Sequence, residues 1–461
     1  MSAGSCAFPL NQLLPFLVSA FGLFGCSATQ RPAAKPAPLI LFPPIATAPT
    51  PAPALRDDKL PPVMLGIDVL EAEGFTAVKG KRIGLLTHPA GVNRRGERTV
   101  DVLRRAPGVT LVALFGVEHG INSEFSSGAN YGDYVDKRTG LPVRSLYDGK
   151  ITDGKSRRPT KAQLKDLDAV VVDLQDIGTR SYTFISAMRG ALEACFENGK
   201  EIIVLDRPNP LGGLKVDGPP LDAGLAVNNY VGAFRVPYVH GLTIGELAHM
   251  AAQDLTMSEA VRARGKLTVV PMRGWTRAMR WSETGLPWVP TSPNMPDFAA
   301  VQGYPMVGLG CEPPSGFRSG VGDQHWFRGL SHVAAKPDVI EKELRALNVP
   351  GIQFRRISVP SAKTGLPAIG LFIEITDWDA WHPAELNFWL LKIDCKLSAK
   401  NPYTAAKLDN KSMFARLLGS SGFLNDLVTK GKNIDVEAWV RVWREQAKVY
   451  QEQSKKFWLY H

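Results

Sequence analysis

One stretch of the chain, residues 111–120, constrains the fold more than any other. Leu111 to Phe115 form an uninterrupted apolar run. Such a run predicts a strand buried on both faces, as in a parallel sheet covered by helices on each side. Glu118 and His119 follow it within a few residues. Open α/β sheets bind ligands outside the carboxyl ends of their strands, so these two side chains are candidates for a functional site. Ordinary loop residues would fit the pattern equally well.

Two more buried strands are predicted downstream, over 169–174 and 201–205, and predicted helices over 99–106, 161–167 and 182–198 alternate with the strands. This alternation predicts an α/β fold with a doubly wound parallel sheet. In such a sheet the carboxyl ends of the strands share one edge, which favours a binding crevice there. Polar residues follow both downstream strands: Asp173, Gln175 and Asp176 after the first, and Asp206, Arg207 and Asn209 after the second.

The composition changes near residue 290, where prolines 287, 290, 293 and 296 recur at every third position. This spacing predicts a stiff crossing between two lobes. We therefore predict one domain over 63–296 and a second, smaller α+β domain over 297–461. In the second domain the pattern predicts helices over 336–347, 385–397 and 436–449, and a strand over 371–375.

The N-terminal residues 1–26 are predicted to be an export signal. Their apolar part, 13–25, is too short to span a bilayer and leads into Leu23-Phe-Gly-Cys26, which resembles the lipobox of bacterial lipoproteins. The absence of Lys or Arg before Arg31 argues against this interpretation. Residues 27–62 are a Pro-rich linker. We therefore expect an exported protein, periplasmic or anchored to the membrane by a lipid on Cys26.

Charge and cysteine content exclude some classes of function. The net charge is +10, but the basic residues are scattered and no nucleic-acid-binding signature is present, which argues against a nucleic-acid partner. Outside the signal, Cys195, Cys311 and Cys395 are odd in number and lack metal-like spacing. Cys195 falls on the apolar face of a predicted helix, so we expect it in the core.

Several carboxylates at one sheet edge would supply the two carboxyl groups that a glycoside hydrolase requires. Glu118 is the predicted general acid, because partial burial after an apolar strand would raise its pKa. Asp173 or Asp176 would stabilise a cationic transition state, or position a nucleophile or water. For Asp173, a structural role as a strand-end residue that caps a neighbouring loop is an equal alternative.

Basic residues near the same edge allow two further interpretations. Arg180 and Arg207 can each hold a substrate carboxylate through two parallel hydrogen bonds. For Arg207, a buried salt bridge to Asp206 is an equal alternative. A metal site is a minor alternative, because no close ligand spacing such as His-x-His occurs. Its ligands would come from His88, His119, His240, Asp173 and Asp206.

The dinucleotide fingerprint and the nucleophile elbow are both missing. No Gly-x-Gly-x-x-Gly follows any predicted strand, which disfavours a dinucleotide despite the predicted fold. No Gly-x-Ser-x-Gly occurs either. We therefore expect no cofactor.

The chain resembles the exo-acting β-N-acetylmuramidase family (NamZ-type), long catalogued as a domain of unknown function, in several sequence motifs and in their order. The resemblance extends from about residue 64 to the C-terminus. The matching segments are Gly66-Ile-Asp-Val-Leu, Gly80-Lys-Arg-Ile-Gly-Leu-Leu-Thr, Phe115-Gly-Val-Glu-His-Gly, Gly140-Leu-Pro-Val-Arg-Ser-Leu-Tyr, Asp173-Leu-Gln-Asp-Ile-Gly-Thr-Arg-Ser-Tyr-Thr-Phe, Leu205-Asp-Arg-Pro-Asn-Pro-Leu-Gly-Gly, His240-Gly-Leu-Thr-Ile-Gly-Glu-Leu, Gly285-Leu-Pro-Trp-Val-Pro-Thr-Ser-Pro-Asn-Met-Pro and Phe457-Trp-Leu-Tyr.

The resemblance implies a Rossmann-like N-terminal domain, a smaller C-terminal domain and a cleft between them. It also implies release of N-acetylmuramic acid from the non-reducing end of peptidoglycan fragments such as muropeptides or muramyl disaccharides. The catalytic glutamate of the family corresponds to Glu118, and the lactyl carboxylate of muramic acid would give Arg180 or Arg207 a partner. The substrate-binding residues expected on this basis are His119, Gln175, Asp176, Arg180, Tyr182, Asp206, Arg207, Asn209, His240 and Asn294.

One segment departs from the family pattern. After Tyr304-Pro305 the family usually carries Glu-Gly-Thr and then Glu-Gly-Arg-Gly-Thr, whereas this chain has a different sequence over 308–323. Glu312 and Arg318 are the residues that could substitute. The departure keeps a second interpretation open, namely a lipoprotein that binds a muropeptide or glycan without cleaving it.

Overall fold

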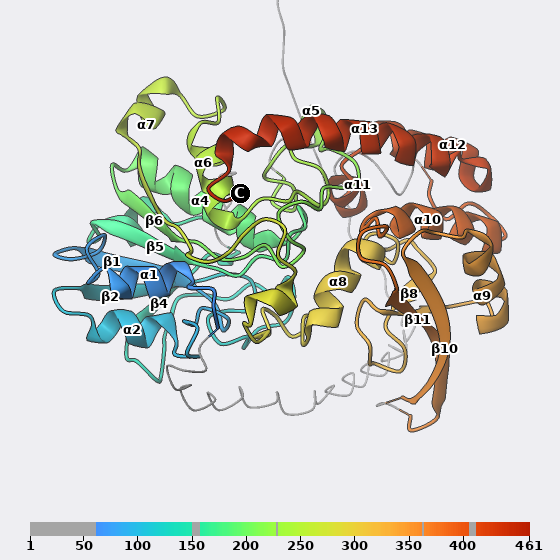
Figure 1. Cartoon of the computed structure of the whole chain (residues 1–461), viewed down its shortest axis with the longest axis horizontal. Coiled ribbons are helices and arrows are strands. Elements are labelled where there is room, and N and C mark those ends of the chain that lie inside the picture. Colours follow the sequence, from blue (N-terminus) through green and yellow to red (C-terminus); the bar gives the residue numbers. More distant parts are fainter. Residues whose placement is uncertain (1–60, 150–156, 227–228, 362–363, 405–411) are drawn as a thin grey trace, which may run out of the picture. The chain divides into compact units, whose positions relative to one another are not determined.

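The structure is a computed structural model that describes residues 61–149, 157–226, 229–361, 364–404 and 412–461 (Figure 1). The predicted export signal, and the predicted linker apart from its last two residues, lie outside these ranges. None of the helices in the described ranges is both long and apolar enough to cross a membrane.

The larger sheet has seven strands in the order β3-β4-β2-β1-β5-β6-β7. Every neighbouring pair is parallel except β3 and β4, which confirms the predicted parallel sheet. The carboxyl ends of the parallel strands therefore meet at one edge. The strands are β1 (Arg82–Thr87), β2 (Thr110–Gly116), β3 (Tyr134–Val135), β4 (Pro142–Ser145), β5 (Ala169–Asp173), β6 (Glu201–Leu205) and β7 (Lys266–Val270).

Helices cover both faces of this sheet (Figure 1). Alternate residues of β5 show the arrangement, because Val170 and Val172 pack in one core with α4 and α6, whereas Ala169 and Val171 pack in another with α1 and α2. Burial on both faces explains why these strands are apolar without alternation. The helices are α1 (Gly66–Ala72), α2 (Thr99–Arg105), α3 (Lys161–Leu164), α4 (Thr183–Glu197), α5 (Ala223–Ala226), α6 (Ile244–Ala252) and α7 (Glu259–Arg264).

Local capping fixes where several of these helices begin. Thr160 and Thr243 each accept a hydrogen bond from the backbone N–H three residues later, and the side chains of Gln163 and Glu246 return the bond. Each pair thus forms a capping box. Cys195 of α4 is fully buried in the core, as predicted.

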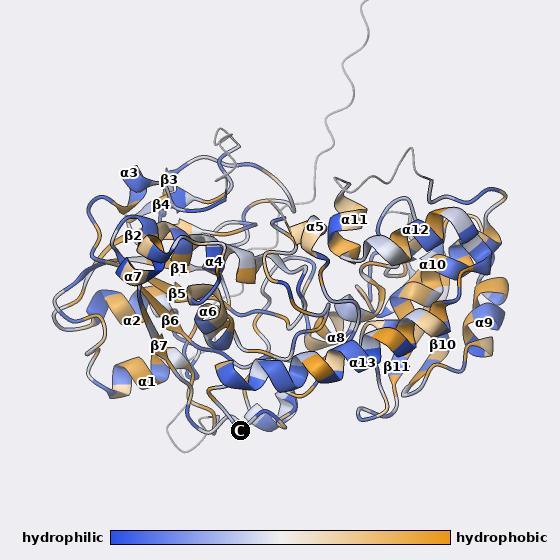
Figure 2. Cartoon of the chain, turned by 90° about the horizontal axis from the view of Figure 1, so that it is seen from above, coloured by the Kyte–Doolittle hydropathy of each residue, from blue (hydrophilic) through white to orange (hydrophobic). Residues whose placement is uncertain are grey.

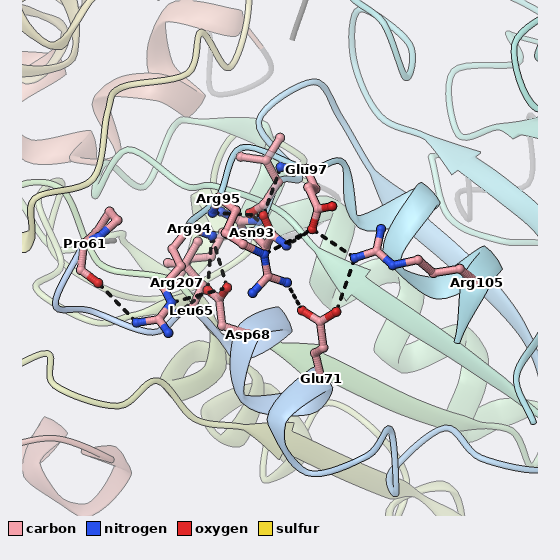
Figure 3. Close-up of polar contacts among 11 residues, drawn as sticks. Pro61, Leu65, Asp68, Glu71, Asn93, Arg94, Arg95, Glu97, Arg105 and Arg207 are labelled. Carbon is pink, nitrogen blue, oxygen red and sulfur yellow. Dashed lines mark hydrogen bonds and ion pairs between the residues drawn. The ribbon is translucent and has the colours of Figure 1, made fainter. Parts of the chain in front are cut away.

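A polar network ties α1 to the segment that leads into α2 (Figure 3). The Asp68 carboxylate accepts bonds from the backbone N–H of Leu65 at 2.8 Å and of Arg94 at 3.2 Å. Arg105, at the end of α2, reaches Glu71 of α1 at 3.2 Å. These contacts hold α1 against α2 and the loop before it.

The C-terminal part has its own four-stranded antiparallel sheet, in the order β10-β11-β9-β8. This confirms the predicted second α+β unit. Figure 2 shows α13 in both blue and orange, as expected for a helix with one buried stripe. The elements are α8 (Phe298–Val307), β8 (Phe317–Ser319), β9 (Gly329–His332), α9 (Pro337–Ala346), β10 (Ile352–Pro360), β11 (Pro367–Ile375), α10 (Glu385–Leu397), α11 (Met413–Leu418), α12 (Ser421–Lys430) and α13 (Val436–Ser454), with short 3-10 helices η2 (Trp281–Thr284), η3 (Gly431–Asn433) and η4 (Lys455–Phe457).

The core of the C-terminal part also receives residues from before α6. Leu211, Leu221 and Tyr238 pack in the same apolar cluster as Trp381 and Phe388 of the C-terminal part. The predicted crossing at the prolines lies between η2 and α8, and the structure has no helix or strand over 285–297. The segment between β6 and α6 therefore joins the two sheets through side-chain packing.

Candidate active site

Glu118 lies two residues beyond the end of β2, and its side chain is partly exposed. Its Oε1 accepts hydrogen bonds from the backbone N–H of Gly128 at 2.9 Å and the hydroxyl of Ser127 at 3.1 Å. Its Oε2 accepts from the hydroxyls of Thr183 at 2.8 Å and Tyr147 at 3.3 Å. Donors from three separate segments thus fix both oxygens of this carboxylate.

These donors determine the charge of Glu118. Burial raises its pKa, but hydrogen bonds from Thr183, Gly128 and Ser127, together with the imidazole of His119, outweigh burial, and the net effect lowers the pKa below its usual range. The sequence predicted a raised pKa, and this prediction is wrong. Glu118 is therefore ionised near neutral pH and suits charge stabilisation or proton acceptance in the free protein.

His119 helps to shape the turn that carries Glu118. Its φ of 71° is in the left-handed region, and Gly120 follows with a φ of 79°. The side chain is buried, and Nδ1 lies 2.8 Å from the carbonyl of Phe125, so this nitrogen is the one that donates. The ring is thereby held inside its own loop, next to the Glu118 carboxylate.

Asp173 ends β5 and is fully buried in an ion pair with Arg207. Arg207 donates to its two oxygens at 2.5 and 2.9 Å, the Thr99 hydroxyl donates as well, and Arg207 also reaches the carbonyl of Val92 at 2.6 Å. The partner of Arg207 is thus Asp173, and not Asp206 as one alternative had it. The geometry favours a structural role for both residues.

Asp206, after β6, is also fully buried. One oxygen accepts from the backbone N–H groups of Arg207 and Gly245, and the other from the hydroxyls of Thr243 and Tyr460. Burial raises the pKa of Asp206 to about 6 despite these bonds. The residue fastens the start of α6 and the C-terminus to the sheet, which leaves its carboxylate without free acceptor positions for a ligand.

Arg180 is fully buried at the approach to α4. In the described residues its two terminal nitrogens donate to carbonyl groups, and its buried Nε has no partner. Its partners are Pro219 at 2.8 Å and Val236 at 2.9 Å, and Leu417 and Leu418 at the end of α11 at 3.1 and 3.2 Å. Burial lowers its pKa to about 10. Arg180 therefore connects α4 to the C-terminal part, and it is enclosed by the protein where the sequence predicted contact with a substrate carboxylate.

Asp176 differs from the other strand-end carboxylates because one oxygen is unused. Its Oδ2 accepts from the backbone N–H of Gly178 at 2.8 Å and from Nε2 of His240 at 3.2 Å. His240 must carry its proton on Nε2, because Nδ1 accepts from the backbone N–H of Leu242. Among the described residues, no group hydrogen-bonds to the buried Oδ1 of Asp176. Its carboxylate thus keeps one acceptor for a ligand.

Tyr182 is affected by the charges of both Glu118 and Asp176. Burial raises its pKa, hydrogen bonds from Thr291 and Ser292 oppose the rise, and the charges of Asp176 and Glu118 add to it. Its hydroxyl lies 2.7 Å from Oγ1 of Thr291. Since both carboxylates act on this one phenol, the structure brings Glu118 and Asp176 into the same region.

The remaining predicted residues divide into buried and exposed ones. The amide groups of Gln175 and Asn209 are engaged with the backbone, Gln175 with two carbonyls and Asn209 with the carbonyl of Leu242. Asn294 is exposed. His88 is buried and accepts from the backbone N–H of Gln175 at 2.9 Å, and burial lowers its pKa to about 3.

The metal alternative finds no support in the part of the chain that the structure describes, where no group of three or more histidine, cysteine or acidic side chains could hold an ion.

Glu312 is a second carboxyl group in an unusual environment. It is partly buried, no hydrogen bond or ion pair to its carboxylate occurs within the described ranges, and burial raises its pKa. Its charge acts on Tyr238 and Tyr304. The hydroxyls of both tyrosines lie 3.2 Å from Oγ of Ser181, two residues before the Thr183 that binds Glu118. Glu312 thus acts on two tyrosines that contact Ser181, while Glu118 is bound by Thr183, and the pKa values of the two glutamates are shifted in opposite directions.

The arginine of the segment that departs from the family pattern is bound to carbonyls of its own segment. Arg318 is exposed, and its guanidinium donates to the carbonyls of Ser315 and Phe317 at 2.7 Å each. From the sequence, Glu312 was predicted only as a substitute for the usual family residues of this segment. Tyr147 and Thr183 were not predicted as site residues. The order of motifs marked the strand ends but carried no signal for donors that reach Glu118 from distant segments.

Two models of one family match the chain, the N-terminal part of the exo-β-N-acetylmuramidase NamZ over residues 83–299 and its C-terminal part over residues 302–460. The chain belongs to the NamZ family. This confirms the resemblance found in the motifs. NamZ proteins are glycoside hydrolases, so the function of this chain, at the level of the family, is that of an exo-β-N-acetylmuramidase.

Individual relatives agree with this assignment. The peptidoglycan β-N-acetylmuramidase NamZ of Bacillus subtilis is 35% identical over 405 residues, which cover 87% of this chain and 92% of the relative. Two crystal structures of DUF1343 family proteins from Bacteroides fragilis share the fold. One has a TM-score of 0.73 at 34% identity and the other 0.60 at 25% identity, and each comparison covers 87% of this chain and 99% of the other.

Proposed function

We propose that this NamZ-family protein removes terminal, non-reducing N-acetylmuramic acid from peptidoglycan fragments, with Glu118 as the catalytic carboxylate. The relative from Bacillus subtilis is named for peptidoglycan, which supports this substrate class. The environment of the Glu118 carboxylate is the main support for the proposal. It combines partial exposure, fixed orientation and a lowered pKa at the carboxyl end of β2, whereas Asp173 and Asp206 are enclosed by their protein partners.

Hydrolysis of a glycosidic bond needs one ionised carboxylate and one proton donor. The lowered pKa of Glu118 suits the ionised role, as nucleophile, base or stabiliser of an oxocarbenium-like transition state. Glu312, whose pKa is raised by burial, suits the proton donor for the leaving oxygen. Two carboxyl groups with pKa values pushed apart are the arrangement that acid and base roles require.

Turnover by the full chain tests the proposed function. A chromogenic β-N-acetylmuraminide should be hydrolysed, and the corresponding β-N-acetylglucosaminide should be hydrolysed more slowly. Release of N-acetylmuramic acid from a muramyl disaccharide should accompany this activity. Binding of the disaccharide without turnover would contradict the proposal and favour the alternative of a glycan-binding lipoprotein.

The pH dependence tests the two roles. We expect kcat/KM to rise as Glu118 ionises, below the usual carboxyl range, and to fall as Glu312 loses its proton, above that range. Glu312→Gln should remove the falling limb and lower turnover of the disaccharide by about 10²–10⁴-fold. A substrate with an acidic phenol as leaving group should lose less activity, because that group departs without a proton.

The partly exposed Glu343, which pairs with Lys396 at 2.7 Å, provides a control in the same part of the chain. Glu343→Gln should keep both limbs of the profile. An unchanged falling limb in Glu312→Gln would rule out Glu312 as the proton donor.

We also propose that the protein is exported and carries a lipid on Cys26. Peptidoglycan lies outside the cytoplasmic membrane, which supports export, and the Leu23-Phe-Gly-Cys26 sequence supports lipidation. In bacterial cells that process lipoproteins, the full chain should fractionate with membranes, and Cys26→Ser should move it to the soluble exported fraction or leave it unprocessed. A parent protein that stays in the cytoplasm would overturn this expectation.

A further inference from the structure

One guanidinium near Glu118 has no hydrogen-bond acceptor among the residues that the structure describes. Arg157 is partly buried, and its Cζ lies 4.7 Å from the ring centre of Tyr147 and 4.9 Å from that of Tyr230. Within the described ranges, no carboxylate or carbonyl accepts a hydrogen bond from it. An arginine that stacks on aromatic faces keeps the donors at its edge available for a planar anion.

The same aromatic ring connects Arg157 to Glu118. The hydroxyl of Tyr147 contacts Oε2 of Glu118 at 3.3 Å, while the guanidinium of Arg157 stacks on the ring. The hydroxyl of Tyr230, beside it, is buried and without a hydrogen-bond partner in the described residues. The guanidinium of Arg157 is thus connected to the carboxylate of Glu118 through Tyr147, and the unpaired hydroxyl of Tyr230 lies beside this ring.

The two arginines predicted from the sequence to bind the substrate are bound to protein groups instead. Arg180 donates to four carbonyl groups, and Arg207 is paired with Asp173. Arg157 also has a φ of 66°, an unfavourable conformation for a residue other than glycine. Such a conformation persists where the surrounding structure holds the residue in place.

We propose that Arg157 binds the carboxylate of the lactyl group of the substrate and thereby selects muramic acid over glucosamine. This inference rests on the proposed function, because the lactyl carboxylate distinguishes N-acetylmuramic acid from N-acetylglucosamine. The lactyl group is attached to the same sugar ring whose glycosidic bond is cleaved. Its anion must therefore lie close to the catalytic carboxylate, which is where Arg157 lies.

The test compares two substrates and two variants of the full chain. The substrates are a chromogenic β-N-acetylmuraminide and its lactyl methyl ester, which removes the negative charge. Arg157→Met keeps an apolar side chain against the tyrosines. It should lower kcat/KM for the free acid by about 10- to 100-fold, as expected for loss of charge-assisted hydrogen bonds, and should leave kcat/KM for the ester within about threefold of the parent.

Arg158→Met is the matched control, because Arg158 contacts Glu193 and Glu197 of α4. It should keep the preference of the parent for the acid over the ester. Equal losses on acid and ester in Arg157→Met would overturn the proposal and assign Arg157 a structural role.

Calorimetry separates this inference from the proposed function. If the parent cleaves neither substrate, the proposed function fails, and binding of N-acetylmuramic acid and its methyl ester decides the role of Arg157. Tighter binding of the acid by the parent, lost in Arg157→Met, would support the carboxylate site. Equal affinity of the parent for acid and ester would overturn it.

Discussion

Glu118→Gln should lower turnover of a β-N-acetylmuraminide by about 10²–10⁴-fold, the range in which a positioned acid or base contributes to catalysis. The amide has nearly the same shape, and its oxygen can still accept from the N–H of Gly128 or the hydroxyl of Thr183. The negative charge, however, is lost. Because the side chain is partly exposed, we expect the free energy of unfolding to change by no more than about 1 kcal/mol. Steady-state kinetics and urea unfolding measure the two effects.

Glu124 is a matched control for this variant. It lies in the same loop, is also partly buried, and accepts hydrogen bonds from Asn122 at 2.9 Å and the hydroxyl of Tyr134 at 3.0 Å. Glu124→Gln should keep turnover within a few-fold of the parent. Binding of a muramyl disaccharide should survive in Glu118→Gln. Retained turnover in this variant would remove Glu118 from the mechanism.

Asp173→Ala should destabilise the protein by about 3–5 kcal/mol, the usual effect of leaving one member of a buried ion pair without its partner. Arg207 is 4% exposed and would keep only the carbonyl of Val92 among its present acceptors. Replacing both members with apolar residues, as in Asp173→Leu with Arg207→Met, should cost less than the sum of the single changes. Urea unfolding of the parent, Asp173→Leu, Arg207→Met and the double variant measures this coupling.

The exposed pair of Asp101 and Arg138, 2.7 Å apart, supplies the surface comparison. Asp101→Ala should lower the free energy of unfolding by at most about 1 kcal/mol, because solvent screens such pairs.

Activity per folded molecule separates the structural role of Asp173 from a catalytic one. Asp173→Asn should retain it if the pair is structural, whereas a large loss of kcat at unchanged stability would restore the catalytic role predicted from the sequence.

The fold was accessible from the sequence where local patterns are strong. The apolar runs of β2, β5 and β6 and the helix α4 appear in the structure close to where they were predicted. Elements with weak local signals were missed. β10 carries the exposed Arg355 and Arg356, and α8 contains Pro305, which disfavours a helix interior. Their formation depends on partners that are distant in the chain.

The candidate site was only partly accessible. Glu118 was found because it follows a buried strand, but the predicted direction of its pKa shift was wrong, since the donors that lower the pKa, Gly128 and Thr183, come from other segments. Arg157 belongs to no recognisable motif. Its availability follows from its surroundings, and a sequence does not record which donors remain unpaired.

The sequence alone determined the order of strands and helices, the sheet edge where polar residues gather, and the family. These features follow from the hydrophobicity and capping preferences of neighbouring residues. Only the tertiary structure decided which polar side chains remain available for a ligand. Arg180 and Arg157 look alike in sequence, yet two carbonyls that accept from Arg180 are more than 200 residues away, whereas the described residues hold no acceptor for the Arg157 guanidinium. The physical reason is that burial and pairing depend on contacts between distant segments, and these arise only when the chain has folded.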